Sequence, residues 1–353
     1  MTLDTKKSAF IELGKFLNQF SENNTLKNPN VLHNETFFDA FQDLIHLSQS
    51  HNGWYTPDNV YFALASWAET LTNNKLEQWL SEYDLPANTS KKVALILAGN
   101  IPLVGFHDFL SVLLTGHYVM VKTSSNDQHL LPFLAKYLIA VAPELENHIT
   151  FVNGKLESFD AVIATGSNNT SRYFEYYFKD KPSIIRKSRN SIAVLTGEES
   201  KEELTALGED IFRYFGLGCR NVSKLFVPKG YSFDAFFNAI FSFQEVIHYE
   251  KYANNYDYNK AVFLMSNFKL LDNGFLTLKE DRSHASPISS VFYEYYEDLS
   301  ELQSRLLAEN EVLQCIVTNA AIENKITFGE TQKPQLWNYA DNIDTISFLL
   351  NIP

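Results

Sequence analysis

Residues 93–98, Val-Ala-Leu-Ile-Leu-Ala, form a continuous apolar run that leads directly into Gly99, Asn100, Ile101 and Pro102. A run of this kind is typical of a strand that is covered on both faces, as in a parallel sheet. Pro102 suits the first turn of a helix, so we expect a helix from there to about residue 115. The stretch therefore predicts a strand–turn–helix unit, which is the repeating element of α/β folds.

The same alternation continues along the chain, and three helices are expected before it, over 5–22, 36–49 and 58–83. Further strands are expected at 118–122, 149–152, 161–164, 191–195, 223–227 and 312–317, and residues 287–296 and 343–350 are expected to be extended or mixed. Further helices are expected at 127–141, 168–178, 199–213, 232–247, 251–268 and 298–309. Strands and helices that alternate in this way favour right-handed crossovers and doubly wound sheets.

The length of 353 residues favours two domains. We expect residues 1–195 to hold the N-terminal helices and a nucleotide-binding domain, and residues 196–325 to form a second doubly wound domain. Residues 326–353 are expected to return to the interface between the two domains.

Composition excludes several classes of protein. A net charge of −13 argues against nucleic acid as a partner, because phosphate binding needs a basic surface. No stretch approaches the ~18 consecutive apolar residues of a membrane span, and residues 1–20 lack the pattern of a signal peptide. The two cysteines, Cys219 and Cys315, form no disulfide framework, so a cytoplasmic protein is expected.

Cys219 lies in the segment Tyr-Phe-Gly-Leu-Gly-Cys-Arg-Asn-Val-Ser-Lys, residues 214–224. Gly216 and Gly218 let the backbone turn sharply and approach a ligand. Arg220 and Lys224 bring positive charge, which favours the nucleophilic thiolate. The segment alone supports equally a catalytic cysteine and a small buried apolar residue.

Polar groups follow three of the expected strands, at the sheet edge where α/β proteins bind ligands. Asn100 follows the first strand, Lys122 ends the second and is followed by three hydroxyl residues, and Gly166 lies between two hydroxyl residues at the start of a helix, which could receive a phosphate. Each group also has an ordinary structural explanation, as a helix cap, a solvated strand end or a turn residue. None of the three segments contains the six-residue glycine fingerprint of the common dinucleotide fold.

Taken in order, these segments resemble the aldehyde dehydrogenase superfamily, and within it the acyl-CoA reductase family typified by the reductase subunit of the bacterial luminescence fatty acid reductase. The resemblance runs from about Ala63 to Leu350 and includes the segments around Asn100, Lys122, Gly166 and Cys219, with residues 339–345 near its end. It implies an aldehyde dehydrogenase-like α/β fold with two Rossmann-like domains after an N-terminal helical segment.

The resemblance also implies roles for individual residues. Cys219 matches the catalytic nucleophile, and Asn100 matches the asparagine that forms the oxyanion hole with the cysteine N–H. The cofactor-binding residues implied by position are Lys122, Ser124, Ser125, Gly166 and Ser167. No metal is implied.

Two departures from the superfamily pattern refine the expected reaction. The glutamate that activates water in hydrolytic members falls on Ile185, which favours thiol-driven acyl exchange over hydrolysis. Ser125 replaces the glutamate that binds the ribose hydroxyls in NAD-preferring members, so NADPH is the expected cofactor and NADH the alternative.

The function expected from the resemblance is NADPH-dependent reduction of an acyl thioester, such as fatty acyl-CoA, to an aldehyde. The acyl group would come from CoA or an acyl-protein thioester, with an acyl-protein synthetase as candidate partner, and a homo-oligomer is expected by analogy. Two alternatives are a reductase of another activated acyl group, such as an acyl phosphate, and a catalytically silent nucleotide-binding homologue. A third is a cysteine hydrolase with His107 or His117 as its base.

Overall fold

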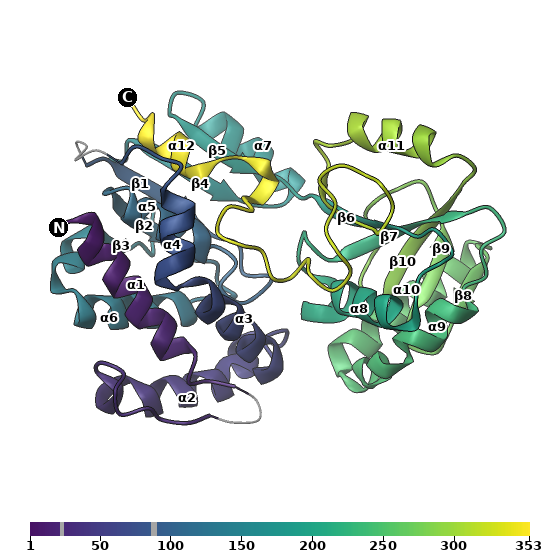
Figure 1. The fold of residues 1–353 in the computed structure, drawn as a ribbon, viewed down its shortest axis with the longest axis horizontal. Coiled ribbons are helices and arrows are strands. Elements are labelled where there is room, and N and C mark those ends of the chain that lie inside the picture. The colour runs from purple at the N-terminus through teal and green to yellow at the C-terminus, as the bar shows by residue number, and fades with distance from the viewer. Residues whose placement is uncertain (22–24, 86–89) are drawn as a thin grey trace. The chain divides into compact units, whose positions relative to one another are not determined.

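The computed structural model describes residues 1–21, 25–85 and 90–353. The chain folds as two compact units, and Figure 1 follows the chain through both. Residues 1–187 and 335–353 form the first unit, and residues 188–334 form the second.

The first unit opens with four helices, α1 (Leu3–Leu17), α2 (Asn34–His51), α3 (Pro57–Thr70) and α4 (Asn73–Leu80). Threonine side chains cap α1, α3 and α4, each accepting a hydrogen bond from a backbone N–H of the first turn. The single helix expected over 58–83 is therefore two helices, because the chain leaves the helical conformation at Leu71 and Thr72 caps a new helix.

The first sheet has the strand order β3-β2-β1-β4-β5 and is parallel throughout. Its strands are β1 (Lys92–Ile96), β2 (Tyr118–Lys122), β3 (Ile149–Phe151), β4 (Ala161–Thr165) and β5 (Ser183–Arg186). They alternate with α5 (Phe106–Leu114), α6 (Leu130–Val141), the short 3-10 helix η1 (Pro143–His148) and α7 (Asn168–Tyr177). The order of the strands reverses between β1 and β4, as in the doubly wound folds that bind nucleotides.

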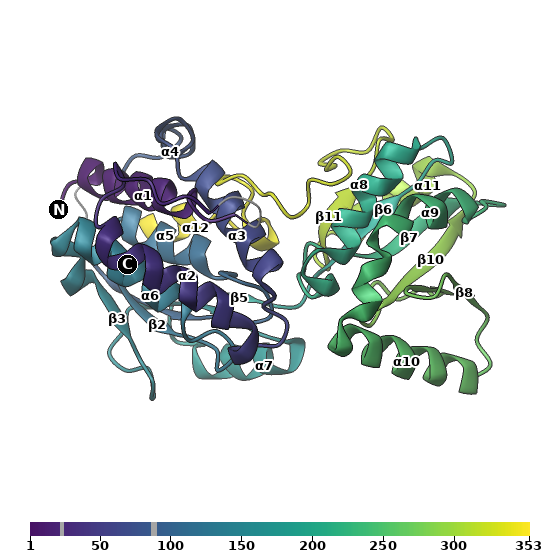
Figure 2. The ribbon, with the colours of Figure 1, turned by 90° about the horizontal axis from the view of Figure 1, so that it is seen from below.

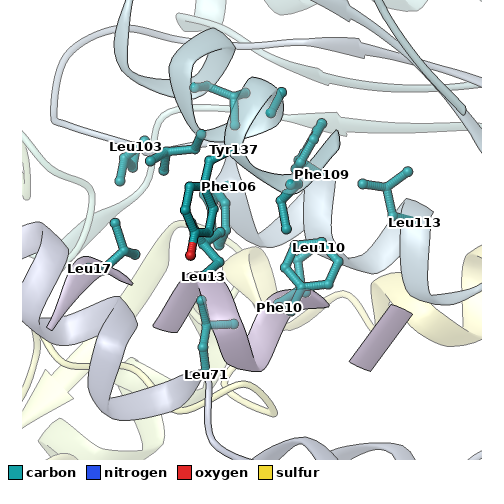
Figure 3. Packing of buried hydrophobic residues seen from close by; sticks show 14 of the residues in the cluster. Phe10, Leu13, Leu17, Leu71, Leu103, Phe106, Phe109, Leu110, Leu113 and Tyr137 are labelled. Carbon is teal, nitrogen blue, oxygen red and sulfur yellow. The ribbon is translucent and has the colours of Figure 1, made fainter. Parts of the chain in front are cut away.

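A continuous apolar core joins the N-terminal helices to this sheet. Figure 3 shows side chains of α1 packed against side chains of α5, with Tyr137 of α6 beside them. The labelled residues of α1 and α5 are Phe10, Leu13, Leu17, Phe106, Phe109, Leu110 and Leu113, all of them buried. Because α1 adds to the core that covers the sheet, the N-terminal helices are an integral part of the first unit.

The C-terminal segment returns to the first unit, where Figure 1 shows it in yellow. It contains η4 (Ala340–Asn342) and α12 (Thr345–Leu350). The expectation of extended or mixed structure over 343–350 missed α12, which forms because Asp344 accepts a hydrogen bond from the Ser347 N–H and caps a helix. The expected position of residues 326–353 at an interface between the two domains stays a prediction.

The second unit contains a sheet in the order β11-β6-β7-β10-β9-β8, in which only the β8–β9 pair is antiparallel. Its strands are β6 (Asn190–Val194), β7 (Val222–Pro228), β8 (Leu270–Asp272), β9 (Thr277–Glu280), β10 (Ser290–Tyr296) and β11 (Leu313–Val317). The helices are α8 (Lys201–Phe212), α9 (Asp234–Ile240), α10 (Glu250–Met265) and α11 (Leu299–Ala308), with 3-10 turns η2 (Arg213–Gly216) and η3 (Phe241–His248). Figure 1 shows α11 on one side of this sheet and α8 and α9 on the other, and α8 and α9 also lie close together in Figure 2.

The boundary between the units lies at residue 187 rather than at the expected residue 195. The physical reason is that β6 pairs with β7 and β11, which places residues 190–194 in the second sheet. Within the described ranges, no helix is both long enough and apolar enough to cross a membrane.

Candidate active site

Cys219 is exposed, at a turn directly before β7, whereas Cys315 is buried in β11. Three successive residues before the turn have positive φ: Tyr214 (53°), Phe215 (57°) and Gly216 (76°). Side chains other than glycine rarely adopt this conformation, and such strain is concentrated at functional sites. The ring of Phe215 stacks on Tyr249 with the centroids 4.5 Å apart, which helps to hold the strained segment.

Lys224, one of the two residues expected to bring positive charge to Cys219, forms its contacts elsewhere. Lys224 is fully buried, and its Nζ donates to Glu294 (2.7 Å) and to the Arg282 carbonyl (2.9 Å). Burial lowers the pKa of Lys224, and the carboxylate of Glu294 compensates its charge. The charge of Lys224 is therefore used within the core of the second unit rather than at Cys219.

Arg220 reaches the second cysteine, with 3.5 Å between its Nη1 and the sulfur of Cys315. Burial raises the pKa of the Cys315 thiol, which keeps it in the unreactive protonated form. Of the two cysteines, Cys219 is thus the accessible candidate nucleophile.

Asn100 lies in the first unit, half-buried in the loop after β1. Neighbouring residues hold this loop: the Tyr55 hydroxyl donates to the Ile101 carbonyl (2.9 Å), and the Asn52 amide donates to the Gly99 carbonyl (3.2 Å). Burial raises the pKa of Asp127 to about 6, and this carboxylate also faces Tyr55.

The loops after β1 and β2 touch at Gly99. A Cβ atom added to Gly99 would lie 2.8 Å from both the Cβ and the Oγ of Ser124, which is closer than such atoms approach. The Asn52 amide also donates to the Asn126 carbonyl (3.3 Å) and so ties the two loops together. The structure therefore places Asn100 and Ser124 in adjoining loops at the carboxyl edge of the first sheet.

The remaining predicted cofactor residues lie at the same edge. Lys122 ends β2 and donates from Nζ to the Gly154 carbonyl (3.0 Å), and Ser125 is exposed. Gly166 follows β4, and a Cβ there would lie 3.0 Å from Thr170 Cβ and 3.1 Å from the Phe174 ring, so glycine is needed for close packing of α7. The Ser167 side chain accepts from the Thr170 N–H and caps α7.

This edge has the topology of a nucleotide site. The ends of β1 and β4 flank the point where the strand order reverses, which is where doubly wound sheets bind ligands. α7 begins beside that point, and the positive end of a helix favours a phosphate.

The sequence did not reveal a buried ion pair beside these loops. Arg186, next to Ile185 at the end of β5, donates from Nη2 to Asp108 (2.6 Å) and to Thr345 Oγ1 (3.0 Å). Its Nη1 donates to the Ala340 carbonyl (2.7 Å). The ion pair joins β5, α5 and the C-terminal segment, and the only signal for it in the sequence is an aspartate within the largely apolar segment 106–114.

The two histidines considered as bases have structural contacts. His107 Nε2 lies 2.8 Å from the Leu336 carbonyl, and His117 Nε2 lies 3.0 Å from the Leu349 carbonyl. Both tie the C-terminal segment to α5 and the turn that follows it. In the residues that the structure describes, no group of three or more His, Cys, Asp and Glu is placed to hold a metal ion.

Part of the chain matches a known protein family. Residues 76–238 match the acyl-CoA reductase (LuxC) family. The match covers the segments of Asn100, Lys122, Gly166 and Cys219, and it confirms the resemblance drawn from the sequence. No curated protein sequence matches the chain significantly.

Solved structures of aldehyde dehydrogenases share the fold. KauB from Pseudomonas aeruginosa has 13% identity and a TM-score of 0.62, over 90% of this chain and 72% of that chain. Aldehyde dehydrogenase 21 from Physcomitrella patens, in complex with the reaction product succinate, has 11% identity and a TM-score of 0.65, over 99% and 84%. An aldehyde dehydrogenase from Bacillus cereus in complex with NAD+ has 13% identity and a TM-score of 0.61, over 90% and 72%. These similarities confirm the expected aldehyde dehydrogenase-like α/β fold, the fold to which the acyl-CoA reductase (LuxC) match also points.

Proposed function

We propose that this chain reduces an acyl thioester, such as a fatty acyl-CoA, to an aldehyde through an acyl-enzyme on Cys219. The observation that carries the proposal is the exposed Cys219 on a turn that follows the strained residues 214–216, within the range that matches the acyl-CoA reductase (LuxC) family. Strain of this kind is maintained only where the surrounding structure enforces it, and it is common at catalytic residues.

In the first half of the reaction, the Cys219 thiolate attacks the thioester carbonyl carbon and the carbonyl electrons move to oxygen. The backbone N–H of Cys219 would donate to that oxyanion, a contact worth roughly 3–4 kcal/mol in comparable enzymes, and the family resemblance assigns the side-chain amide of Asn100 as the second donor. The C–S bond to CoA then breaks, CoA leaves as a thiolate, and the acyl group stays on Cys219.

We place the nicotinamide cofactor at the carboxyl edge of the first sheet. Lys122, Ser124 and Ser125 would hold the adenosine ribose, and the turn at Gly166 and Ser167 would receive the pyrophosphate. The position of the Gly166 turn directly before α7 supports the pyrophosphate assignment, because backbone N–H groups at the start of a helix favour a phosphate. When bound, the cofactor supplies the hydride that reduces the acyl carbon.

The chain's own residues complete the cycle. Cys219 leaves as a thiolate when the thiohemiacetal oxygen re-forms the carbonyl, which releases the aldehyde. Because Ile185 cannot take a proton from water, the acyl-enzyme persists until hydride or a thiol reaches it. CoA or an acyl-protein synthetase would deliver the acyl group, and we propose a homo-oligomer as the working form.

Intact-protein mass spectrometry tests the proposal. Wild-type protein incubated with acyl-CoAs of several lengths, without cofactor, should gain one acyl group, and Cys315→Ala should behave likewise. Cys219→Ala should gain none and should lack reductase activity with NADPH. An adduct or reductase activity that persists in Cys219→Ala would contradict the mechanism, and acylation by acyl phosphates alone would favour the other substrate class.

A further inference from the structure

Asn221 ties the Cys219 turn to the end of α8. The Asn221 side chain is only 3% exposed, and its Oδ1 accepts the Gly218 N–H at 2.8 Å. Its amide donates to the carbonyl oxygens of Asp210 (3.1 Å) and Arg213 (2.8 Å). Carbonyl groups at the end of a helix lack partners within the helix. The Asn221 side chain therefore both satisfies two of these carbonyls and anchors the turn that carries Cys219.

The backbone of Asn221 fixes the peptide that precedes Cys219. Its N–H donates to the Gly218 carbonyl at 3.0 Å. That carbonyl and the Cys219 N–H belong to one peptide group, which is trans and planar, so they point in opposite directions. Since the carbonyl points into the turn, the Cys219 N–H points away from it.

Ser191 holds the peptide on the other side of Cys219. Its side chain is fully buried in β6, and its Oγ donates to the Cys219 carbonyl at 2.9 Å. The register of β6 shifts beside Ser191 in both of its strand pairings. In the pairing with β7 the shift lies between Ser191 and Ile192 of β6, and in the pairing with β11 it lies between Leu313 and Ile316 of β11. Irregularities of this kind re-aim side chains and are frequent next to active sites.

We propose that Ser191 and Asn221 are positioning residues that clamp both peptides flanking Cys219 and so aim its N–H as the oxyanion donor. The inference rests on the proposed acylation of Cys219. Neither side chain contacts the substrate: both act through the backbone of the nucleophile. Catalytic groups need placement within about 0.5 Å, and a shift of about 1 Å costs on the order of 100-fold in rate.

The test compares two reactions of the same thiol. Acylation by an acyl-CoA needs the aimed N–H, whereas alkylation by iodoacetamide needs only an accessible thiolate. Ser191→Ala should lower the acylation rate about 10- to 100-fold while the rate and pH profile of alkylation stay at wild-type values. In steady-state reduction the loss should appear in kcat rather than in KM.

Ser223→Ala is the matched control. The Ser223 hydroxyl, on the adjoining strand, donates to the His284 carbonyl (2.6 Å) and to the backbone carbonyl of Ser191 (3.3 Å), but to neither peptide that flanks Cys219. It should acylate at the wild-type rate. A second variant, Asn221→Asp, keeps the oxygen that accepts from Gly218 and removes the donors to Asp210 and Arg213, so it should show the same selective loss even if Ser191→Ala fails to fold.

The outcomes distinguish a failure of the proposed clamp from a failure of the proposed acylation of Cys219. Equal acylation rates in Ser191→Ala and Ser223→Ala would overturn the clamp and leave the proposed function intact. A parallel loss of acylation and alkylation in Ser191→Ala would also overturn the clamp. The Ser191 hydroxyl would then affect the reactivity of the Cys219 thiolate and not the orientation of the Cys219 N–H. Wild-type protein that is alkylated at Cys219 but never acylated would contradict the proposed function itself.

Discussion

Single residues at the carboxyl edge of the first sheet determine the proposed cofactor preference. Ser125 is exposed after β2, at the position where the resemblance implies a glutamate in NAD-preferring members. A neutral side chain there does not repel a 2′-phosphate, whereas a carboxylate would repel it and could instead accept from two ribose hydroxyls.

We therefore expect wild-type protein to bind NADPH more tightly than NADH. Ser125→Glu should weaken NADPH binding by about tenfold or more, since one like-charge contact near a surface costs on the order of 1–2 kcal/mol, and should change NADH binding much less. Titration of cofactor fluorescence measures both, with Ser125→Ala as the uncharged control. NADH binding at least as tight as NADPH in wild-type protein would refute the assignment.

Asp210 is a buried carboxylate that links the Cys219 region to a later segment. It is fully buried and accepts from the Gly329 N–H (2.7 Å), the Thr331 N–H (3.0 Å) and the Thr331 hydroxyl (2.7 Å). Burial outweighs these donors and raises its pKa to about 6.

Because the folded-state pKa of Asp210 is higher than its unfolded value, its contribution to stability is present below about pH 4 and is lost as pH rises through about 6. Asp210→Asn should remove this dependence. The stability of wild type minus that of the variant should fall by roughly 2–3 kcal/mol between pH 4 and pH 7. Urea unfolding at several pH values measures it, and a difference that stays flat or rises with pH would contradict the prediction.

At the scale of elements, the C-terminal segment holds the first unit together. Arg186 bonds to Asp108, Ala340 and Thr345, so one guanidinium joins β5, α5 and the returning chain. Tyr339 adds a second attachment, since its hydroxyl accepts from the Trp79 indole (2.7 Å) and contacts the Tyr83 hydroxyl (2.7 Å).

Arg186→Met should destabilise the first unit by about 3–5 kcal/mol, because it leaves Asp108 charged and buried without its partner. Lys187→Met is the control: Lys187 pairs with Glu175 at 2.7 Å on the surface, and losing that pair should cost at most about 0.5 kcal/mol. Thermal or urea unfolding compares the two variants. Equal effects would show that the buried pair contributes no more than a surface one.

At the scale of the whole molecule, local patterns in the sequence predicted most elements. The apolar run at 93–98 became β1, and the expected strand at 118–122 matches β2 residue for residue. β5 was missed because only Ile184 and Ile185 are apolar within it, and α12 was missed because its cap at Asp344 was not recognised. Such short segments depend on tertiary contacts that no local pattern records.

The strand order and the boundary between the units could not be predicted from the sequence, because both depend on contacts between distant segments. The strand order, and with it the boundary at residue 187, depends on pairing between β6 and β11, which are far apart in the chain. The sequence singled out Cys219 from its glycines, but the bond from Ser191 to its carbonyl needs β6 and β7 side by side. The roles of Cys219, Asn100 and the cofactor residues stay predictions.

One measurement tests the central claim directly. Cys219 is acylated with an acyl-CoA, free acyl-CoA is removed, and the acyl-enzyme is mixed with NADPH in a single turnover. The account predicts one aldehyde formed and one NADPH oxidised per acylated Cys219, with complete loss of the adduct and slow hydrolysis when NADPH is omitted. An adduct that persists in the presence of NADPH, or that is released as the free acid, would contradict it.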